Sequence, residues 1–470
     1  MVNLLSSQQE RASQVTRSQL LWLFGQVLAF DALEPTRGGA ARGFYRRVWC
    51  PWLTLWYLVW QRLQANHTLQ AVVTDARRGG ADALRLGHPK RLSQRIVSGA
   101  TSAFSKARAR LPLAWVKSAF TTAAQRLTQW GPVRPADALP LQLWDGSTLR
   151  MRPLGDLPKH FPPYRTRRKK AYWCGARVVV GFCAHTGVAL AAQMAALPRS
   201  EQALAVELIL AAPRALHVGD RNFGVWRVAR AAVQSGGQAL LRLTGARAKK
   251  LAASRRFKPG LDRAVAWDPS AHDQADRGLR KQSVAGRLVV VRAPRRGYRT
   301  IRLFLFTTLT DTRAYPPQRL LELYGLRWQV ELNLRTVKST LGLAQREVKS
   351  ADLAQKEFYA GLMAYNLVRG FMGLAARQAG CAPGALSFAG ARTSLTATLS
   401  LLWLHWLPPQ ARWAQWQRLV EEVSRARLPH RTKPRPSEPR AQCYPPQVFP
   451  KLRGSRAEAR KQLKKQHAKG

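Results

Sequence analysis

Acidic side chains are scarce in this sequence. Its 470 residues include 25 Asp and Glu against 77 Lys and Arg, which gives a formal net charge of +52 at pH 7. A chain with this excess binds polyanions strongly, so nucleic acid is the first partner to consider and a membrane surface is the weaker alternative. Because 46% of the residues are hydrophobic and 16 are Trp, the composition indicates extensive folded cores and disfavours a basic tail or packaging protein.

Cysteine is also rare, and its positions exclude two kinds of site. The five Cys show no CxxC pair and no Cys/His ligand spacing, so we expect neither a zinc site nor a disulfide framework. The same scarcity indicates a protein of the reducing cytosol.

Long apolar runs are missing as well. Val48 to Trp60 and Leu401 to Leu407 fall short of the roughly 20 residues of a membrane-spanning helix and are interpreted as buried helices. No secretory signal is visible at the amino terminus.

The most informative stretch runs from Tyr324 to Lys338. Apolar residues recur there at steps of three and four, which predicts one helix with a buried stripe of Leu323, Leu326, Val330, Leu334, Val337 and Leu341. A polar stripe lies about 100° further round the helix, at Tyr324, Arg327, Glu331, Arg335 and Lys338. Pro316 and Pro317 are typical of a helix start, and Gly342 of its end. Taken alone, the polar stripe is best explained as a solvated face with ion pairs at i,i+4.

Between residues 135 and 243 the pattern changes to that of strands alternating with helices. We expect a short strand from Leu141 to Trp144 that ends at Asp145, and a turn at Gly146 into a second strand. Asp145 could simply belong to this Asp-Gly turn. Further strands are predicted at 177–183, 188–192, 215–218 and 238–243, with helices at 201–211 and up to 234. This order predicts an α/β fold with an RNase H-like layer, in which Asp145 and Asp220 fall at strand ends and can meet.

The length of the chain suggests about three domains. Residues 1–130 are predicted to be mainly helical, most clearly at Ser18 to Phe30, Pro51 to Leu63 and Ala114 to Leu127, with Thr101 to Arg110 as the best candidate for a DNA-reading helix. The predicted domains are a helical DNA-binding domain at 1–130, a catalytic core at 131–243 and 301–385, a β-rich insertion at 244–300, a helical region at 386–424 and a basic, Pro-rich tail at 425–470.

The insertion follows from the gap between Asp220 and Glu331, which is too long for a simple connection. Its many Lys and Arg side chains are interleaved with aromatic residues such as Trp267, a mixture that suits contact with a nucleic-acid backbone and base stacking. A solvated loop with locally packed aromatics is the plainer alternative. Further on, 353–376 is predicted to be a long helix that carries polar supporting groups at Tyr365, Asn366 and Arg369.

The spacing of four residues resembles the signature of a known enzyme family. Tyr324, Arg327, Glu331 and Lys338 match the Tyr-Arg-Glu-Lys signature of DDE transposases from bacterial insertion sequences, the Tn-five- and Tn-ten-like class of insertion sequence family four. Asp145-Gly-Ser resembles the block around the family's first acid, and Asp220-Arg-Asn-Phe-Gly resembles the second. All three blocks occur in the family's order, so the resemblance covers most of the chain.

This resemblance implies a function and an assembly. Members of the class nick DNA at terminal inverted repeats, release the element, often through a hairpin intermediate, and join its 3′ ends to target DNA. They use a helical end-binding domain, an RNase H-like core and a mainly β insertion that helps to process the transposon end. A homodimer on paired ends, double-stranded DNA as partner, no membrane, and a location in the bacterial cytoplasm with the nucleoid are expected by the same likeness.

The proposed chemistry rests on three carboxylates. Without imidazole or thiolate partners, Asp145, Asp220 and Glu331 make an oxygen-only site that suits Mg²⁺ or Mn²⁺. Two such ions can promote an in-line displacement at phosphorus, with Asp145 expected to bridge both ions and the other two acids to hold one each. Phosphate and DNA contacts are assigned to Tyr324, Arg327, Lys338, Arg335, Arg221 and Trp267.

Two other functions remain open at this stage. A metal-dependent nuclease of the same fold would cleave DNA without strand transfer. A DNA-binding regulator descended from a transposase would keep the acids only as remnants, although the intact set of three argues against it.

Overall fold

The structure is a computed structural model, and its description covers most of the chain between residues 48 and 428. The described residues are 48–64, 67–82, 90–132, 139–165, 170–212, 214–254, 257, 260–275, 277–280, 282–295, 298–340, 342, 345–346, 348–402, 409–428, 455, 457–458 and 460–461. The chain divides into one unit of Met1–Ala293 with Ile301–His430 and a second of Pro294–Thr300 with Arg431–Gly470. The helix predicted at Ser18 to Phe30 and nearly all of the tail lie outside the described residues.

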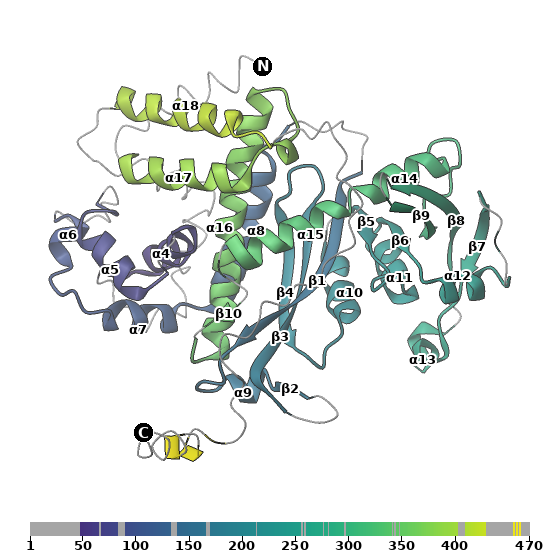
Figure 1. Cartoon of the computed structure of the whole chain (residues 1–470), viewed down its shortest axis with the longest axis horizontal. Coiled ribbons are helices and arrows are strands. Elements are labelled where there is room, and N and C mark those ends of the chain that lie inside the picture. Colours follow the sequence, from purple (N-terminus) through teal and green to yellow (C-terminus); the bar gives the residue numbers. More distant parts are fainter. Residues whose placement is uncertain are drawn as a thin grey trace, which may run out of the picture. The chain divides into compact units, whose positions relative to one another are not determined.

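A mixed sheet of ten described strands forms the centre of the first unit (Figure 1). Its main order is β2-β3-β1-β5-β6-β9-β8-β7, with β4 paired to β3 and β10 paired to β1. The strands are β1 Leu141–Met151, β2 Pro163–Arg165, β3 Lys170–Cys183, β4 Ala189–Ala196, β5 Leu216–Gly219, β6 Gln238–Arg242, β7 Asp262–Trp267, β8 Val284–Arg295, β9 Tyr298–Thr307 and β10 Gln345–Arg346. The predicted α/β class is confirmed at this level.

The first strand differs from its prediction. β1 runs without a break through Asp145 and Gly146, which lie opposite Val180 and Val179 of β3 in an antiparallel ladder. The predicted turn at Asp145-Gly146 is therefore wrong. The reason is tertiary: the long β3 strand offers hydrogen-bond partners over the whole length of β1, so the Asp-Gly pair continues the strand.

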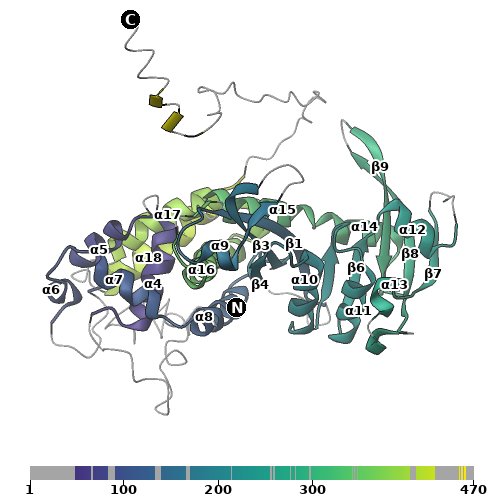
Figure 2. The ribbon, with the colours of Figure 1, turned by 90° about the horizontal axis from the view of Figure 1, so that it is seen from below.

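Helices cover both faces of the sheet, and Figure 2 shows α10 and α15 on opposite sides of it. One face packs against α10 Glu201–Leu210 and α11 Trp226–Gln234, and the other against α8 Leu113–Thr128, α15 Trp328–Arg335 and α16 Ala351–Gln378. Along β1, Leu143 belongs to the core beneath α16, whereas Trp144 belongs to the core beneath α10. Because side chains alternate along a strand, Asp145 faces the α15 side and Gly146 faces α10.

Several local predictions for helices are confirmed. α4 spans Pro51–Leu63 as predicted, and α8 extends the predicted segment by one residue at each end. α10 begins at Glu201 as predicted, and the Ser200 hydroxyl caps it by accepting a hydrogen bond from the Ala203 backbone N–H. The remaining helices are α5 Leu69–Arg77, α6 Leu92–Arg95, α7 Ser102–Arg110, α9 Leu157–His160, α12 Gly245–Leu251, α13 Ala271–Gln274, η2 Arg277–Leu279, α14 Pro317–Gly325, η3 Thr336–Thr340, η4 Pro383–Ala385, α17 Phe388–Leu402 and α18 Pro409–Arg425.

The amino-terminal helices are attached to α16 by buried charges. Arg62 of α4 and Arg108 of α7 both donate to the carboxylate of Glu357, at 2.9 and 3.1 Å. Arg108 is only 7% exposed, so within the candidate DNA-reading helix it does not face solvent. Its guanidinium turns inward because Glu357 is buried and needs a cationic partner. Lys106 and Arg110 of the same helix are exposed, as the candidate DNA-reading helix requires.

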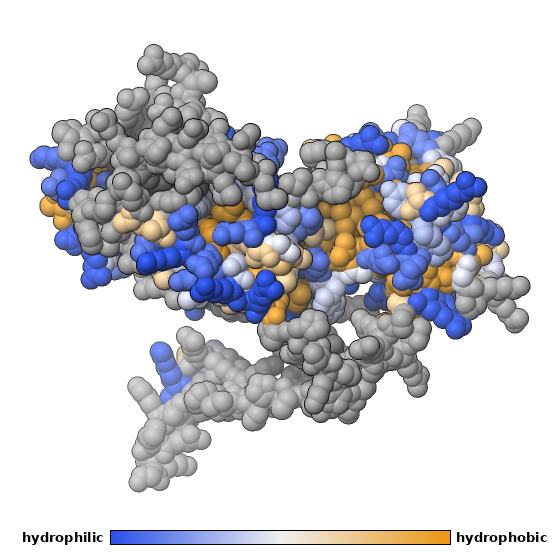
Figure 3. All heavy atoms as spheres, turned by 90° about the horizontal axis from the view of Figure 1, so that it is seen from above, coloured by the Kyte–Doolittle hydropathy of each residue, from blue (hydrophilic) through white to orange (hydrophobic). Residues whose placement is uncertain are grey.

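The insertion continues the central sheet. β9 pairs with β6 and is followed outward by β8 and β7, so these three strands extend the sheet from the edge of β6. On the face drawn in Figure 3, groups of hydrophilic residues surround smaller hydrophobic areas. Within the part of the chain that the structure describes, every helix is too short or too polar to cross a membrane.

Candidate active site

Asp145 and Asp220 come together through the register of two parallel strands. The last register pair between β1 and β5 joins Trp144 to Gly219, so the next residue on each strand is one of the two aspartates. Neighbouring residues in a parallel pair point to the same face of the sheet. Asp220 follows β5 directly, as predicted, whereas Asp145 lies within β1 at the point where β5 ends. Both carboxylates are therefore brought to the face that carries α15.

The charges around Asp145 show that the third acid is also near. Its pKa is raised to about 6, mainly by burial and further by the carboxylates of Asp220 and Glu331. The Gly146 backbone N–H, which donates to Asp145 Oδ1 at 2.9 Å, and the Arg327 guanidinium act in the opposite direction. The structure thus places the three predicted acids within electrostatic reach of one another.

The helix that carries the third acid is not continuous, contrary to its prediction. α14 ends at Gly325 and α15 begins at Trp328, with the backbone N–H of Arg327 bonded to the carbonyl of Tyr324 in a tight turn. A π-helical turn, η3, then follows Arg335. Gly325 favours the break, because glycine is a weak helix former. The predicted start and end are confirmed: α14 begins at Pro317, and Gly342 adopts a left-handed φ of +62°.

Tyr324, Arg327 and Glu331 still form a contiguous group. Arg327 Nη2 donates to Glu331 Oε1 at 2.6 Å, and its guanidinium carbon lies 5.9 Å from the centre of the Tyr324 ring. Burial raises the pKa of the Tyr324 hydroxyl, while the nearby guanidinium groups of Arg327 and Arg242 lower it. The Glu331 side chain is 39% exposed, so solvent or a ligand can reach it.

Lys338 reaches the first acid's strand from the π-helical turn. Its Nζ donates to Ser147 Oγ at 3.1 Å, and Ser147 lies two residues beyond Asp145 on the same face of β1. π-helical turns occur frequently at functional sites. The fourth signature residue is therefore beside the acids even though the helix that was predicted to carry it is broken.

The other three predicted DNA-binding residues lie further out. Arg335 and Arg221 are exposed, on α15 and in the loop after β5. Trp267 is half-buried at the end of β7, where its ring packs edge-on against Phe306 with the centres 4.7 Å apart. That contact belongs to the core of the extended sheet. A role in DNA binding stays a prediction for all three.

The donor set suits a divalent cation, although the side chains have not converged on one. Three carboxylates supply hard oxygen ligands, and the negative charge that raises the pKa of Asp145 would be relieved by a bound cation. Among the described residues, no three His, Cys, Asp or Glu side chains lie close enough together to hold one ion. Glu331 is instead paired with Arg327, so it must leave this partner to become a ligand.

Sequence reasoning missed several residues that support the site. Arg247 Nη1 of α12 donates to the carbonyl oxygens of Arg221 and Gly224, both at 3.1 Å, and so braces the loop that begins with Asp220. Glu201 of α10 contacts the same loop through Asn222. The sequence placed Glu201 only at the start of the helix predicted at 201–211. Nothing in its local pattern indicates a contact with a loop about twenty residues away.

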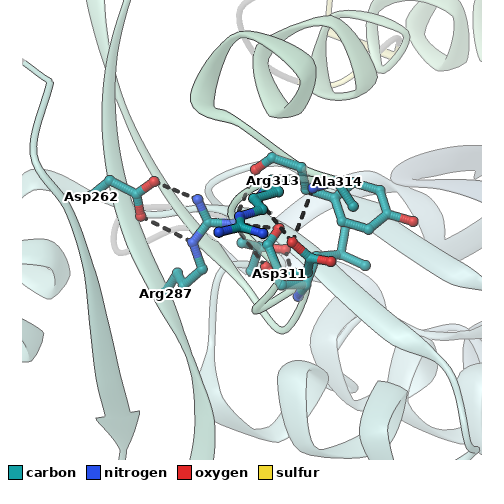
Figure 4. Close-up of polar contacts among 8 residues, drawn as sticks. Asp262, Arg287, Asp311, Arg313 and Ala314 are labelled. Carbon is teal, nitrogen blue, oxygen red and sulfur yellow. Dashed lines mark hydrogen bonds and ion pairs between the residues drawn. The ribbon is translucent and has the colours of Figure 1, made fainter.

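Arg287 is a further support that the sequence did not reveal (Figure 4). This β8 residue is 2% exposed and forms a two-pronged ion pair with Asp262 of β7. Its Nη1 also donates to the carbonyl oxygens of Leu309 and Tyr315, both at 3.0 Å. The loop that it holds is closed by Asp311 and leads directly into α14. The insertion strands are thereby connected to the segment that carries Tyr324.

The chain is similar in sequence to known proteins. Residues 139–367 match the family model described as a transposase DDE domain. The chain is 36% identical over 67 residues to the transposase InsG for insertion sequence element IS4 of Escherichia coli (strain K12), a match that covers 14% of this chain and 15% of that relative. A piggyBac transposase synaptic complex with hairpin DNA has a TM-score of 0.40 and 12% identity, covering 85% of this chain and 81% of the other. All three acids therefore lie inside the segment that matches the transposase DDE domain model.

Proposed function

We propose that this chain is a DDE transposase that cleaves DNA at the inverted-repeat ends of a mobile element and joins those ends to target DNA. The observation that carries the proposal is the placement of Asp145 beside Asp220 with Glu331 in electrostatic reach. These residues lie inside the segment that matches the DDE domain family. The contacts of Tyr324, Arg327 and Lys338 support the finer assignment to the Tyr-Arg-Glu-Lys class.

We infer an RNase H-like core from the order and direction of five strands. They are ordered β4-β3-β1-β5-β6. The β4/β3 and β3/β1 pairs are antiparallel, whereas the β1/β5 and β5/β6 pairs are parallel. Helices cover both faces. In such open sheets, ligands collect at the carboxyl ends of the parallel strands, where Asp220 follows β5.

Asp145, Asp220 and Glu331 would hold two Mg²⁺ or Mn²⁺ ions. Bound there, the ions would activate the attacking water or 3′-hydroxyl and stabilise the leaving oxygen. In the free protein Arg327 neutralises Glu331, and once Glu331 turns to a ligand position the guanidinium is free to contact a phosphate. Lys338 and the Tyr324 hydroxyl would position the scissile phosphate from the same side of β1.

The partner is double-stranded DNA, both at the element's ends and at the target. The net charge of +52 and the exposed Arg335 and Arg221 support contact with its backbone. The exposed part of the half-buried Trp267 ring would be available for stacking against a DNA base. A helical end-binding domain at 1–130, a homodimer on paired ends and a location in the bacterial cytoplasm with the nucleoid complete the proposal by analogy with the family. The chain spans about 15% of the length of the curated relative that it matches, so these whole-protein properties are part of the proposal.

The test uses the full chain and DNA taken from the flanks of its own reading frame. Short inverted repeats bounded by direct duplications would supply the substrate for cleavage and joining in Mg²⁺. Asp145→Asn, Asp220→Asn and Glu331→Gln are each expected to lower cleavage at least roughly a hundredfold, because each removes a metal ligand, and to leave DNA binding intact. Glu322→Gln is the matched control, because this exposed glutamate of α14 pairs only with the neighbouring Arg319 among the described residues.

Each outcome assigns the protein to one function. Joined products that require all three acids support the transposase. Cleavage that requires the acids without any joined product would instead support a nuclease. DNA binding with no cleavage under any of these conditions would overturn the proposal and favour a regulator descended from a transposase.

A further inference from the structure

Glu201 fills the space between the strands that carry the two aspartates. It lies at the start of α10, and its side chain is 17% exposed. A Cβ atom added at Gly146 would lie 2.3 Å from Glu201 Cδ, so the carboxylate packs directly on the backbone next to Asp145. Only glycine leaves this space free. The Asp145 side chain points to the α15 face of the sheet, so Glu201 contacts β1 from the opposite face, which α10 covers.

The other side of the Glu201 carboxylate holds the loop of the second aspartate. Glu201 Oε2 accepts a hydrogen bond from Asn222 Nδ2. The neighbouring Gln202 Nε2 donates to the Asn222 carbonyl and side-chain oxygens, at 3.0 and 2.7 Å. The backbone N–H of Asn222 then donates to Asp220 Oδ1 at 2.8 Å. One continuous chain of contacts thus runs from the amino-terminal end of α10 to the carboxylate of Asp220.

Arg177 fixes Glu201 in this position. Its Nη1 lies 3.5 Å from Glu201 Oε1, while its Nη2 donates to the carbonyl oxygen of Leu197 at 3.1 Å. Arg177 belongs to β3, the strand that pairs with β1 throughout the Asp145 region. The cation also offsets the repulsion between Glu201 and the nearby Asp220.

We propose that Glu201 is a positioning residue that orients Asp220, through Asn222, for binding of a divalent cation. The inference rests on the proposed function in so far as Asp220 is a metal ligand. Glu201 does not bind the metal itself: both of its oxygens have partners, Arg177 and Asn222, on the α10 side of the sheet. Residues that hold a ligand's orientation in this way typically change metal affinity or activity by 10- to 100-fold when they are removed.

The first experiment measures binding of Mn²⁺ alone to the full chain without DNA, by electron paramagnetic resonance of the free ion. Glu201→Ala and Asn222→Ala are each expected to weaken Mn²⁺ binding about 10- to 100-fold. Glu201→Gln is expected to retain most of the affinity, because its amide oxygen can still accept from Asn222 and its size fits the space over Gly146. Since Asn222 is exposed, its variant breaks the link without disturbing the core.

The matched control is Glu207→Ala. Glu207 lies on the same helix and also forms an ion pair, but with Arg199, and its side chain is 47% exposed. This variant should bind Mn²⁺ like the wild type. The double variant of Glu201 and Asn222 should lose no more affinity than either single variant, because both changes break one link.

Opposite results would overturn the inference. Wild-type Mn²⁺ affinity in Glu201→Ala or in Asn222→Ala would do so, as would additive losses in the double variant, or a wild-type protein that does not bind Mn²⁺. The proposed function is tested separately: if the wild type cleaves DNA and Asp220→Asn does not, the transposase assignment stands even when Glu201→Ala has no effect. If no cleavage occurs, Mn²⁺ binding still decides whether Glu201 positions Asp220.

Discussion

Lys338 and Ser147 link two parts of the site that lie 191 residues apart in the sequence. In the free protein the serine hydroxyl is the described hydrogen-bond partner of the ammonium group. A hydroxyl does not neutralise a cation, so the positive charge remains available to a phosphate beside Asp145. This arrangement suits a side chain that positions a phosphodiester bond.

Replacing Lys338 by an uncharged side chain of similar length tests whether its positive charge contributes to DNA cleavage. Lys338→Met is expected to lower DNA cleavage about 10- to 100-fold, because one charge-assisted contact of about 1.5–3 kcal/mol is lost. Single-turnover cleavage at saturating Mg²⁺ measures the effect. Ser147→Ala keeps the charge and should stay within a few-fold of the wild type. Equal rates for Lys338→Met and the wild type would exclude the phosphate role.

At the scale of elements, the contact between β1 and β5 contains a buried histidine. His217 is fully buried, and its Nδ1 accepts a hydrogen bond from Trp144 Nε1 at 3.0 Å. Burial lowers the pKa of His217 from 6.5 to about 4. The folded protein therefore keeps this side chain neutral at a pH where the unfolded chain binds a proton.

The free energy of unfolding should consequently fall as the pH drops. Because the folded pKa is lower than the unfolded one, the stabilisation is present above pH 6.5 and is lost progressively towards pH 4, by up to about 3 kcal/mol. Urea unfolding of the wild type and His217→Asn at several pH values measures the difference. Asp75 and Asp145, whose raised pKa values of about 6 act in the opposite direction, are common to both proteins and cancel. Parallel pH profiles would contradict the prediction.

Arg287 shows how one buried residue can join elements. It connects β7, β8 and the loop before α14 (Figure 4). Arg287→Met should lower the free energy of unfolding by about 3 kcal/mol, because Asp262 and several carbonyl groups lose their donor in a buried setting. Chemical unfolding checks this value. Arg319→Met breaks an exposed pair with Glu322 and should cost at most about 1 kcal/mol. Similar losses for the two variants would show that the Arg287 contacts contribute little.

For the whole molecule, the dominant property is charge. With +52 on 470 residues, binding to duplex DNA should depend steeply on salt. A protein with 6–10 phosphate contacts loses about 10³- to 10⁵-fold in affinity between 50 and 200 mM salt, and we expect a loss of this order. Fluorescence anisotropy with a labelled duplex over this range measures it. In the Glu331→Gln variant the slope should change by at most about one phosphate contact, because Arg327 loses its ion-pair partner and can contact a phosphate. An affinity that is independent of salt would contradict an electrostatic mode of binding.

The sequence by itself determined the local features of this protein. Pro51 and Pro317 start helices, Ser200 caps one, and Gly342 takes a positive φ value where the end of a helix was expected. These features depend on interactions within a few residues, so a linear pattern contains them. The three acids were identified in the same way, from short blocks of sequence.

Only the tertiary structure decided how these parts meet. Asp145 lies within β1 because a long partner strand continues past it, and Lys338 reaches Ser147 from a π-helical turn that interrupts the expected period. The Glu201 and Arg287 contacts join segments about twenty residues or more apart. Such contacts depend on strand register and on the space left by neighbouring side chains, and neither quantity is encoded by any single stretch of the chain.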